Sequence, residues 1–232
     1  MTELTILFPC LNEEKTIKTC IDKAKKIIKE NNIEGEILVA DNGSTDNSLH
    51  IIKKTKVRLI NVKEKGYGNT LINGIKKSNG KYVIFCDSDD SYNIDDIPLF
   101  LEKLKEGYDL VVGNRYAHIE KGAMPLSHYF GVKFLTHLGN IIYKTNLKDY
   151  HCGLRGINKK KIDRLNLECG GMEFASEIII KCKKAELKII EIPTKLFKDG
   201  RGHKSHLNTI SDGFRHINCL LKYRNIDQKR VK

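Results

Sequence analysis

Apolar segments in the first half of the chain alternate between strand and helix patterns, and this alternation restricts the fold more than any other feature. Four short segments have the apolar run of a buried strand, namely 4–8, 36–40, 57–62 and 82–86. Three longer segments repeat apolar residues at helical spacing, namely 17–28, 46–54 and 67–77. Strands and helices that alternate at this interval are joined by right-handed crossovers. We therefore predict an α/β fold with a mostly parallel central sheet flanked by helices.

A polar loop follows each predicted strand. The four loops are 9–13, 41–46, 66–69 and 87–90. In an open parallel sheet, ligands bind beyond the carboxyl ends of the strands. Four separate loops are therefore expected to converge on one binding crevice.

The fourth loop is the most unusual, because Asp87, Ser88, Asp89 and Asp90 directly follow an apolar strand. Carboxylates placed together at a strand end repel one another and resist burial. Hard oxygen ligands of this kind suit a divalent cation that also binds phosphates. Asp87 and Asp89 are two residues apart, so on an extended segment both carboxylates face the same side. The pattern predicts that Asp87 and Asp89 share a cation, Mn²⁺ or Mg²⁺, or divide their contacts between the cation and a ribose.

The second and third loops offer hydrogen-bonding groups for a nucleotide. Asp41 can accept hydrogen bonds from a base or ribose, and residues 42–44 offer donors at a helix start. Helix capping is an equal alternative for Ser44 and Asp46. Gly66 and the residues up to Asn69 would let backbone approach a ligand closely, although a short Gly-x-Gly pattern is equally typical of a plain turn.

Three segments of the second half carry candidate groups for an acceptor site. Apolar residues recur at helical spacing over 123–143, which fits a core-facing helix first and an acceptor-binding or membrane-surface helix second. Residues 172–185 form another predicted helix, in which Glu173 and Glu177 share a face and require a ligand or a basic partner. The loop 196–206 is cationic and contains two glycines. It suits closure over a diphosphate or an acceptor phosphate, with a solvated surface loop as the alternative.

Composition narrows the class of protein. The 232 residues, 40% of them hydrophobic, suffice for one globular unit with a substantial core. The net charge of +12 favours anionic partners such as nucleotides, lipid phosphates or nucleic acid, although lysines on solvated helix surfaces explain much of it. The first residues lack a signal-peptide pattern and no apolar run approaches a membrane span, so we expect a cytoplasmic protein. Seven cysteines without a C-x-x-C pair predict buried, reduced thiols.

The ordered motifs of the chain resemble those of family 2 glycosyltransferases with the GT-A fold. The first three are residues 8–14 (FPCLNEE), 39–46 (VADNGSTD) and 87–89 (DSD). The closer likeness is to the polyprenyl-phosphate or dolichol-phosphate glucose and mannose synthase branch, and it continues through 113–115 (GNR), 151–156 (HCGLRG), 171–177 (GMEFASE), 191–193 (EIP) and 199–201 (DGR). The resemblance implies a Rossmann-like GT-A domain over 1–207, with a nucleotide-sugar-binding half at 1–115 and an acceptor half at 116–207. A C-terminal amphipathic helix and basic tail would follow at 208–232.

The same resemblance assigns roles to individual residues. It implies inverting transfer of a hexose from a nucleotide sugar, with UDP-glucose favoured and GDP-mannose second. The expected nucleotide-sugar ligands are Pro9, Asn12, Glu13, Asp41, Gly66, Asp87 and Ser88. The expected metal ligands are Asp87 and Asp89, and the expected catalytic set is Asp89, Arg115, Glu173 and Arg201. The metal and a cation such as Arg115 or Arg201 would stabilise the departing diphosphate. A lipid-phosphate acceptor needs no strong base, whereas a hydroxyl acceptor requires a carboxylate such as Glu173 or Asp149.

The chain departs from membrane-embedded members of that branch, which append hydrophobic helices. It ends instead in an apolar stripe flanked by basic residues, made of Phe214, Ile217, Leu220 and Leu221. Peripheral docking on the inner face of an anionic membrane and ordinary core packing fit this stripe equally well. A polyprenyl-phosphate acceptor at a membrane surface is therefore expected, with a hydroxyl of a soluble glycan, protein or nucleic acid as the alternative. The sequence leaves the oligomeric state open.

Two other classes of protein compete with a transferase. A non-catalytic nucleotide-binding protein would keep Asp41 and the glycines but would not need Asp87 and Asp89, so metal-dependent donor hydrolysis separates it. A nucleic-acid-binding module would explain the charge, but aromatics are 7%, tryptophan is absent, and no motif interleaves aromatics with basic residues. Steep salt dependence of DNA binding would favour that module. We expect a nucleotide-sugar partner rather than nucleic acid.

Overall fold

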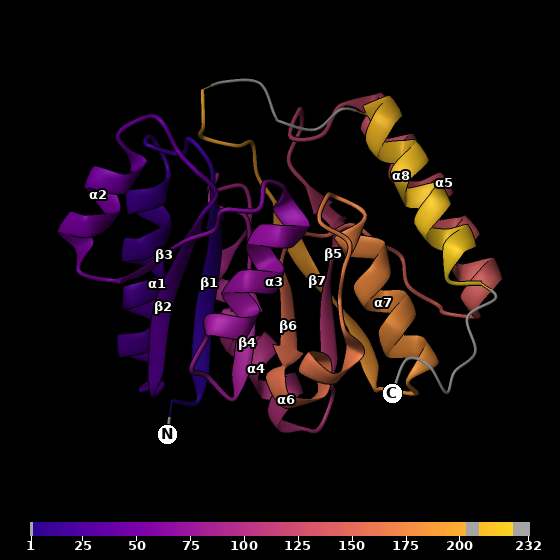
Figure 1. Cartoon of the computed structure of the whole chain (residues 1–232), viewed down its shortest axis with the longest axis horizontal. Helices are drawn as coiled ribbons and strands as arrows, with labels where there is room; N and C mark the ends of the chain where they lie inside the picture. Colours follow the sequence, from indigo (N-terminus) through magenta and orange to yellow (C-terminus); the bar gives the residue numbers. More distant parts are fainter. Residues whose placement is uncertain (1, 203–208, 225–232) are drawn as a thin grey trace.

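Seven strands form one central sheet (Figure 1) in the computed structural model, which describes residues 2–202 and 209–224. The strands are β1 (Leu4–Cys10), β2 (Gly35–Asp41), β3 (Arg58–Asn61), β4 (Tyr82–Phe85), β5 (Leu110–Ile119), β6 (Arg155–Asn158) and β7 (Ile189–Leu196). Their order across the sheet is β3-β2-β1-β4-β6-β5-β7. β6 pairs antiparallel with both of its neighbours, and the other ladders are parallel. The prediction of a mostly parallel sheet is confirmed.

Helices cover both faces of the sheet. They are α1 (Ile17–Glu30), α2 (Ser48–Thr55), α3 (Tyr67–Lys77), α4 (Ile97–Lys105), α5 (Leu126–Tyr143), α6 (Lys159–Ile162), α7 (Phe174–Lys184) and α8 (Thr209–Lys222), with short 3-10 turns η1 (Ile94–Asp96) and η2 (Asp163–Leu165). In Figure 1, α3 and α7 lie in front of the sheet, while α1 and α4 lie behind it. This arrangement follows from the strand order, because the crossover from β1 to β2 through α1 and the crossover from β3 to β4 through α3 run in opposite directions across the sheet, which places their helices on opposite faces.

The central strand β1 shows why the strand-end loops meet. All seven of its residues are buried, as expected for a strand covered on both faces. Its register aligns Cys10 with Asp41, and Asp41 in turn with Asn61, so β1, β2 and β3 end at one edge of the sheet. Phe85 at the end of β4 lies beside Leu7. The loops that follow these strands therefore emerge together.

The predicted thiol chemistry also agrees with the structure. All seven cysteines are free, and six of them are buried. Burial raises the pKa of Cys10 and Cys20 to about 12. These thiols therefore stay protonated at neutral pH and pack as small apolar groups.

Helix α5 differs from its first interpretation as a core-facing helix. Its buried residues are Val132, Leu135, Thr136, Gly139 and Tyr143. The large apolar side chains on another face are 60–76% exposed, namely Leu126, Phe130, Phe134 and Ile141. Core burial is therefore wrong for these four residues. The periodicity detected the helix, but small residues such as Gly139 provide the close approach to Tyr150.

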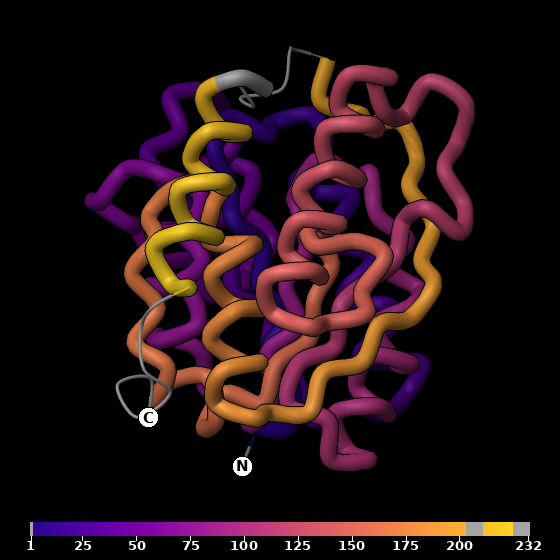
Figure 2. Tube along the Cα trace, turned by 90° about the vertical axis from the view of Figure 1, so that its right-hand side faces the viewer, coloured from indigo at the N-terminus to yellow at the C-terminus, as the bar shows by residue number. Residues whose placement is uncertain are grey.

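Helix α8 packs against α5 and α7 at the edge of the molecule, and Figure 2 shows α5 and α8 side by side. Leu220 is fully buried in a small cluster with Tyr143 and Tyr223, whereas Phe214 and Leu221 are 64% and 51% exposed. The C-terminal stripe therefore divides between core packing and an outer surface. Within the described part of the chain, no helix combines the length and apolar character that crossing a membrane requires. The predicted basic tail from residue 225 onward lies outside the described residues.

Candidate active site

Two adjoining cavities lie at the carboxyl ends of the strands. The first, here called the loop cavity, has a volume of about 340 Å³ and is lined by the loops after β1 to β4 together with Arg201. The second, the helix cavity, has a volume of about 230 Å³ and lies between the sheet and helices α5 and α8. The two share Tyr67, Asp87, Met172 and Asp212. Together the two adjoining cavities offer the space that a small-molecule site requires.

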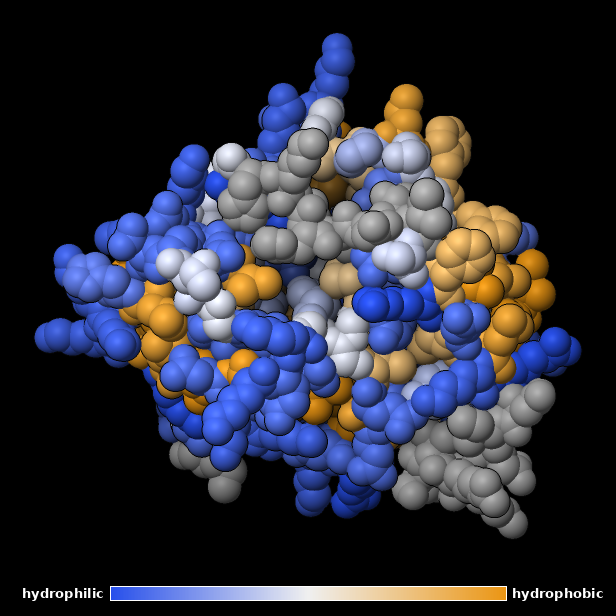
Figure 3. All heavy atoms as spheres, turned by 45° about the horizontal axis from the view of Figure 1, so that its top comes forward, coloured by the Kyte–Doolittle hydropathy of each residue, from blue (hydrophilic) through white to orange (hydrophobic). Residues whose placement is uncertain are grey.

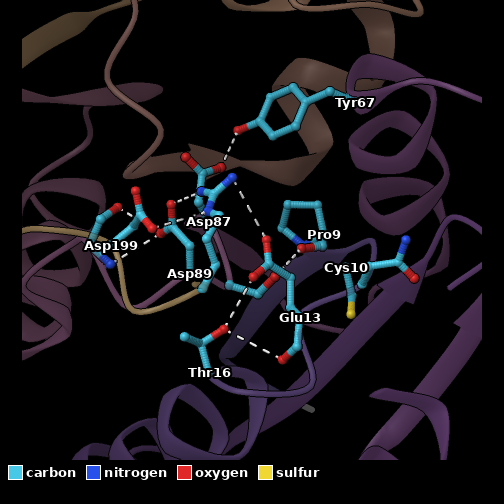
Figure 4. A network of polar contacts seen from close by, with 12 residues as sticks. Pro9, Cys10, Glu13, Thr16, Tyr67, Asp87, Asp89 and Asp199 are labelled. Carbon is cyan, nitrogen blue, oxygen red and sulfur yellow. Dashed lines mark hydrogen bonds and ion pairs between the residues drawn. The ribbon is translucent and has the colours of Figure 1, made fainter. Parts of the chain in front are cut away.

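Every carboxylate of the Asp87–Asp90 segment has a partner, and Figure 4 shows the network around two of them. Asp87 Oδ1 accepts a hydrogen bond of 2.8 Å from the Tyr67 hydroxyl. Asp89 is 4% exposed, and its Oδ2 forms an ion pair with the Arg201 guanidinium. Its Oδ1 accepts hydrogen bonds from the Ser91 hydroxyl and backbone N–H. Cations distant in the sequence thus pair with two of these carboxylates, Arg201 with Asp89 and Lys23 with Asp90.

The segment is not extended as predicted. The chain turns at Ser88 and Asp89, and Asp90 adopts a φ of 61°. Ser88 anchors this turn by donating its hydroxyl hydrogen to Pro9 O at 2.6 Å. Asp90 forms an ion pair with Lys23 of α1 at 2.6 Å. The carboxylates of Asp87 and Asp89 consequently have different surroundings, with Asp87 exposed to both cavities and Asp89 covered by Arg201.

The donor set at this turn fits a hard divalent cation that is bound together with phosphates. Burial raises the pKa of the Asp87 carboxyl, while the hydrogen bond from Tyr67 and the charge of Arg201 oppose this shift. A nearby cation would relieve that burial cost. Among residues 2–202 and 209–224, no group of three or more histidine, cysteine, aspartate or glutamate side chains could hold a metal ion. Mg²⁺ and similar cations are commonly bound by one or two carboxylates plus substrate phosphates, which matches this set.

Pro9, Glu13 and Ser88 line the loop cavity, as their predicted roles require. Glu13 is 6% exposed, and its Oε2 accepts a hydrogen bond from the Thr16 hydroxyl at 3.2 Å. Its Oε1 lies 4.0 Å from Arg201 Nη1. Glu13 and Asp89 therefore hold the Arg201 guanidinium between them at the edge of the cavity.

The side chains of Asn12 and Asp41 stabilise the conformation of the loops by accepting hydrogen bonds from backbone N–H groups. Asn12 Oδ1 accepts a hydrogen bond of 2.8 Å from the backbone N–H of Thr45. The Asp41 carboxylate accepts hydrogen bonds from the backbone N–H groups of Gly43 and Ser44, at 2.8 and 3.1 Å. The sequence predicted that the Asp41 carboxylate accepts hydrogen bonds from a base or ribose. It did not show that backbone N–H groups of this turn already donate to that carboxylate.

Gly66 is required for a close approach of two loops. Its φ is 126°, and a Cβ at this position would lie 2.3 Å from Gly170 O. Its N–H donates to Asn42 Oδ1 at 2.8 Å, which joins the loops after β2 and β3. The glycine thus brings two backbone loops together at the wall of the cavity.

Sequence reasoning missed several side chains of the loop cavity. Lys65 and Tyr67 flank Gly66, and Arg215 and Asp212 reach the same cavity from α8. Lys65 Nζ donates to Asn42 O at 2.6 Å, beside the turn at residue 43. The glycine pattern could have pointed to Lys65 and Tyr67, but only the packing of α8 shows that Arg215 belongs to the site.

Arg115 lines the helix cavity, where it forms a buried ion pair with Asp149. Its Nε and Nη2 donate to the two carboxylate oxygens at 2.7 and 2.8 Å. Burial would raise the pKa of Asp149, but the charge and hydrogen bonds of Arg115 outweigh burial and hold that pKa below its ordinary value. Asp149 is therefore unsuited to act as a base, and Arg115 is already neutralised.

The two glutamates predicted to share a helix face, Glu173 and Glu177, differ in their surroundings. Glu177 is fully buried, and Lys181 Nζ lies 2.8 Å from its Oε1, so the required basic partner is on the same helix. Tyr223 also donates to Glu177 at 2.8 Å. Glu173 precedes the helix, and its Oε1 accepts a hydrogen bond of 3.3 Å from Gly171 N–H. Glu173 Oε2 is buried without a hydrogen-bond partner among the described residues, and Glu173 lines neither of the two cavities, although it was predicted as a catalytic residue.

Comparisons with known proteins show which family and which relatives this chain is similar to. The model of the family described as glycosyl transferase family 2 matches residues 5–165. Low-salt glycan biosynthesis hexosyltransferase Agl6 of Haloferax volcanii is 31% identical over 221 residues, which cover 94% of this chain and 53% of Agl6. Dolichol-phosphate mannosyltransferase of Pyrococcus furiosus is 26% identical over 242 residues, which cover 99% of this chain and 67% of that protein. The chain thus spans about half of the length of Agl6.

The fold has solved counterparts. Glucosyl-3-phosphoglycerate synthase from Mycobacterium tuberculosis, crystallised with Mn²⁺, UDP and phosphoglyceric acid, superimposes with a TM-score of 0.77 at 18% identity. The match covers 97% of this chain and 79% of that one. The same protein was also crystallised with Mg²⁺ and UDP. This likeness confirms the predicted GT-A architecture.

Proposed function

The chain belongs to glycosyl transferase family 2, and from this membership we propose that it transfers a hexose from a nucleotide sugar to a polyprenyl-phosphate acceptor with inversion. UDP-glucose is the favoured donor and GDP-mannose the second candidate. The observation that carries the proposal is the pair of adjoining cavities that share Asp87 at the ends of the parallel strands. The diphosphate of a donor would lie in the loop cavity with its hexose extending past this residue into the helix cavity, where the acceptor phosphate would reach it.

Side chains of the loop cavity suit a nucleoside diphosphate. Lys65, Arg201 and Arg215 supply positive charge around it, and Gly66 exposes backbone. A divalent cation held by Asp87 and Asp89 would supply Lewis-acid stabilisation of the leaving diphosphate. Arg201 pairs with Asp89, and we propose that it exchanges this carboxylate for a donor phosphate when the donor binds.

The acceptor side of the proposal rests on the helix cavity and the surface next to it. Phe134 lines this cavity and is 60% exposed, so the cavity borders the outer apolar surface of α5. Together with α8 this surface contains Leu126, Phe130, Phe134, Ile141, Phe214 and Leu221, and Figure 3 shows orange surface gathered on that side of the molecule. Lys133, Arg215 and Lys222 are exposed on the same helices. We propose that this face rests on an anionic membrane, which delivers the lipid phosphate.

Nucleotide sugars test the donor side directly. UDP-glucose with Mn²⁺ is expected to raise the melting temperature by several degrees, because a ligand that binds only the folded state stabilises it by mass action. The measurement is thermal unfolding with a panel of nucleotide sugars, in the presence and absence of Mn²⁺. A melting temperature unchanged by every member of the panel would contradict the proposal.

Vesicle binding tests the acceptor side. The double variant Phe130→Ser/Phe214→Ser is expected to bind phosphatidylglycerol vesicles at least tenfold more weakly, since burial of each phenylalanine stabilises by about 1.5–3 kcal/mol. Co-sedimentation measures the bound fraction. Leu99→Ser is the matched control, because Leu99 is a 39% exposed apolar residue on α4, on another face. Equal binding by the double variant and the control would remove the membrane from the proposal.

A further inference from the structure

Three polar side chains from separate elements meet at the wall of the helix cavity. His151 precedes β6, Ser176 lies in α7, and His216 lies in α8. His151 Nε2 lies 3.2 Å from His216 Nδ1, and the Ser176 hydroxyl lies 2.9 Å from His216 Nδ1 and 3.3 Å from His151 Nε2. The two imidazole rings meet edge to face, with 4.3 Å between their centroids. These contacts fix the orientation of the His151 ring.

The other nitrogen of this ring, Nδ1, has no hydrogen-bond partner among residues 2–202 and 209–224. His151 Nδ1 is buried and makes no hydrogen bond within the described part of the chain. A buried polar atom without a hydrogen bond is costly, so native proteins rarely keep one without a ligand or water for it. Because Nε2 is occupied by His216 and Ser176, the ring cannot rotate to satisfy Nδ1 without losing those contacts. The open hydrogen-bonding position is therefore built into the fold.

The charge state of the pair restricts what can fill that position. Burial, His216 and the Arg155 guanidinium lower the pKa of His151 well below its usual value. Burial likewise lowers the pKa of His216 to about 4. Both imidazoles are therefore neutral at physiological pH. A neutral ring nitrogen suits an uncharged hydroxyl better than a phosphate, for which a cation would be the better partner.

The cavity around His151 has the mixed polarity that a sugar ring requires. Asp87, Arg115 and His151 give it polar groups, while Val132, Leu135 and Ile217 from α5 and α8 give it apolar ones. A pyranose ring has hydroxyl groups at its rim and C–H groups on its faces. Asp87 joins this cavity to the loop cavity, so a hexose attached to a diphosphate there would extend toward His151.

We infer that His151 is a sugar-recognition residue, whose Nδ1 forms a hydrogen bond with a hydroxyl of the transferred hexose. Ser176 and His216 are positioning residues that hold the ring. The inference rests on the proposed function, because it assigns the hexose of the donor to the helix cavity. A site built to hydrogen-bond a hydroxyl discriminates strongly against sugars that lack it. His151 would then select the hexose of the donor, whereas other residues hold the diphosphate.

Two substitutions that differ by one methylene separate the two ring nitrogens. His151→Asn keeps an amide near the position of Nδ1 and loses the link to His216, whereas His151→Gln keeps a group near Nε2 and loses the Nδ1 position. Calorimetry with Mn²⁺ gives the dissociation constants of UDP-glucose and UDP, and of GDP-mannose and GDP as the second pair. His151→Gln is expected to bind the sugar nucleotide about tenfold more weakly, the factor that corresponds to one hydrogen bond, with the affinity for the free nucleotide unchanged. His151→Asn should retain most of the affinity for the sugar nucleotide.

His137→Gln is the matched control, because His137 is an exposed histidine of α5. Its affinities should equal those of the wild type. Equal weakening of nucleotide and sugar nucleotide in His151→Gln, or no change in either, would overturn the inference while leaving the proposed function intact. A wild-type protein that binds UDP and GDP no better than buffer components would instead contradict the proposed function itself. Circular dichroism of each variant confirms that the fold is retained.

Discussion

Replacing Asp89 by alanine is expected to lower the rate of nucleoside-diphosphate release at least 100-fold. Asp89 is the proposed metal ligand and also the anchor of Arg201, so the variant loses stabilisation of the charge that develops on the leaving group. A coupled assay of nucleoside-diphosphate release from the donor, with and without Mn²⁺, measures the effect. Asp95→Ala is the matched control, because Asp95 is an exposed aspartate of η1, a few residues farther along the chain.

A double-mutant cycle distinguishes the two proposed roles of Asp89, which are metal binding and anchoring of Arg201. Arg201→Ala leaves the carboxylate in place and removes only the guanidinium. If Asp89 acted solely by holding Arg201, the double variant would be no slower than either single variant. If Asp89 binds the metal, the rate of nucleoside-diphosphate release by Asp89→Ala should no longer depend on Mn²⁺, whereas the rate of Arg201→Ala should still depend on it. Metal-dependent turnover at the wild-type rate in Asp89→Ala would refute the assignment of this aspartate.

Breaking the buried ion pair of the helix cavity should give the largest loss of stability. Asp149→Asn leaves the 6% exposed Arg115 guanidinium without its charged partner, and removal of one member of such a pair costs about 3–5 kcal/mol. Urea unfolding followed by circular dichroism measures the change. Asp22→Asn is the control, because Asp22 forms a solvent-exposed ion pair with Lys18 that is worth about 0–1 kcal/mol. Equal losses in both variants would contradict a special role for the buried pair.

The same pair predicts a pH dependence with a definite sign. The folded protein holds the pKa of Asp149 below its ordinary value, so the unfolded chain binds the proton more readily. The stabilisation is complete above the unfolded pKa of about 3.9 and is lost as pH falls through the lower pKa of the folded state. In acid, the stability difference between wild type and Asp149→Asn should therefore shrink.

The sequence predicts those parts of the fold that depend on local patterns. Alternating apolar periods were sufficient to predict a mostly parallel sheet, and the bounds of α3 agree with the predicted 67–77. Strand ends also predicted the convergence of Pro9, Gly66 and Asp87 on one cavity. These inferences succeed because a strand end is a local property, whereas the sheet brings all such ends to the same edge.

Partners that are distant in the sequence explain what the patterns could not show. Arg115 and Asp149 are 34 residues apart, and neither carries a local signal of the other. Arg201 covers Asp89 from 112 residues away. The apolar period of α5 is equally compatible with an inward or an outward face, and only tertiary packing through Val132 and Leu135 decides between them. The orphaned nitrogen of His151 is likewise a consequence of packing, because α8 occupies the other side of the ring.

The division of the sheet into two blocks shows which parts of the chain depend on each other. Strands β1 to β4 form one continuous block of the sheet, and β5 to β7 form the other. A single antiparallel ladder joins the blocks, with Tyr82–Phe85 beside Arg155–Asn158. The loop cavity crosses this seam, because Arg201 and Arg215 reach it from parts of the chain that follow the second block. A chimera that keeps the first block and imports the rest of the chain from a relative would therefore also lose the ion pair between Arg201 and Asp89, unless the relative supplies an arginine at the same place.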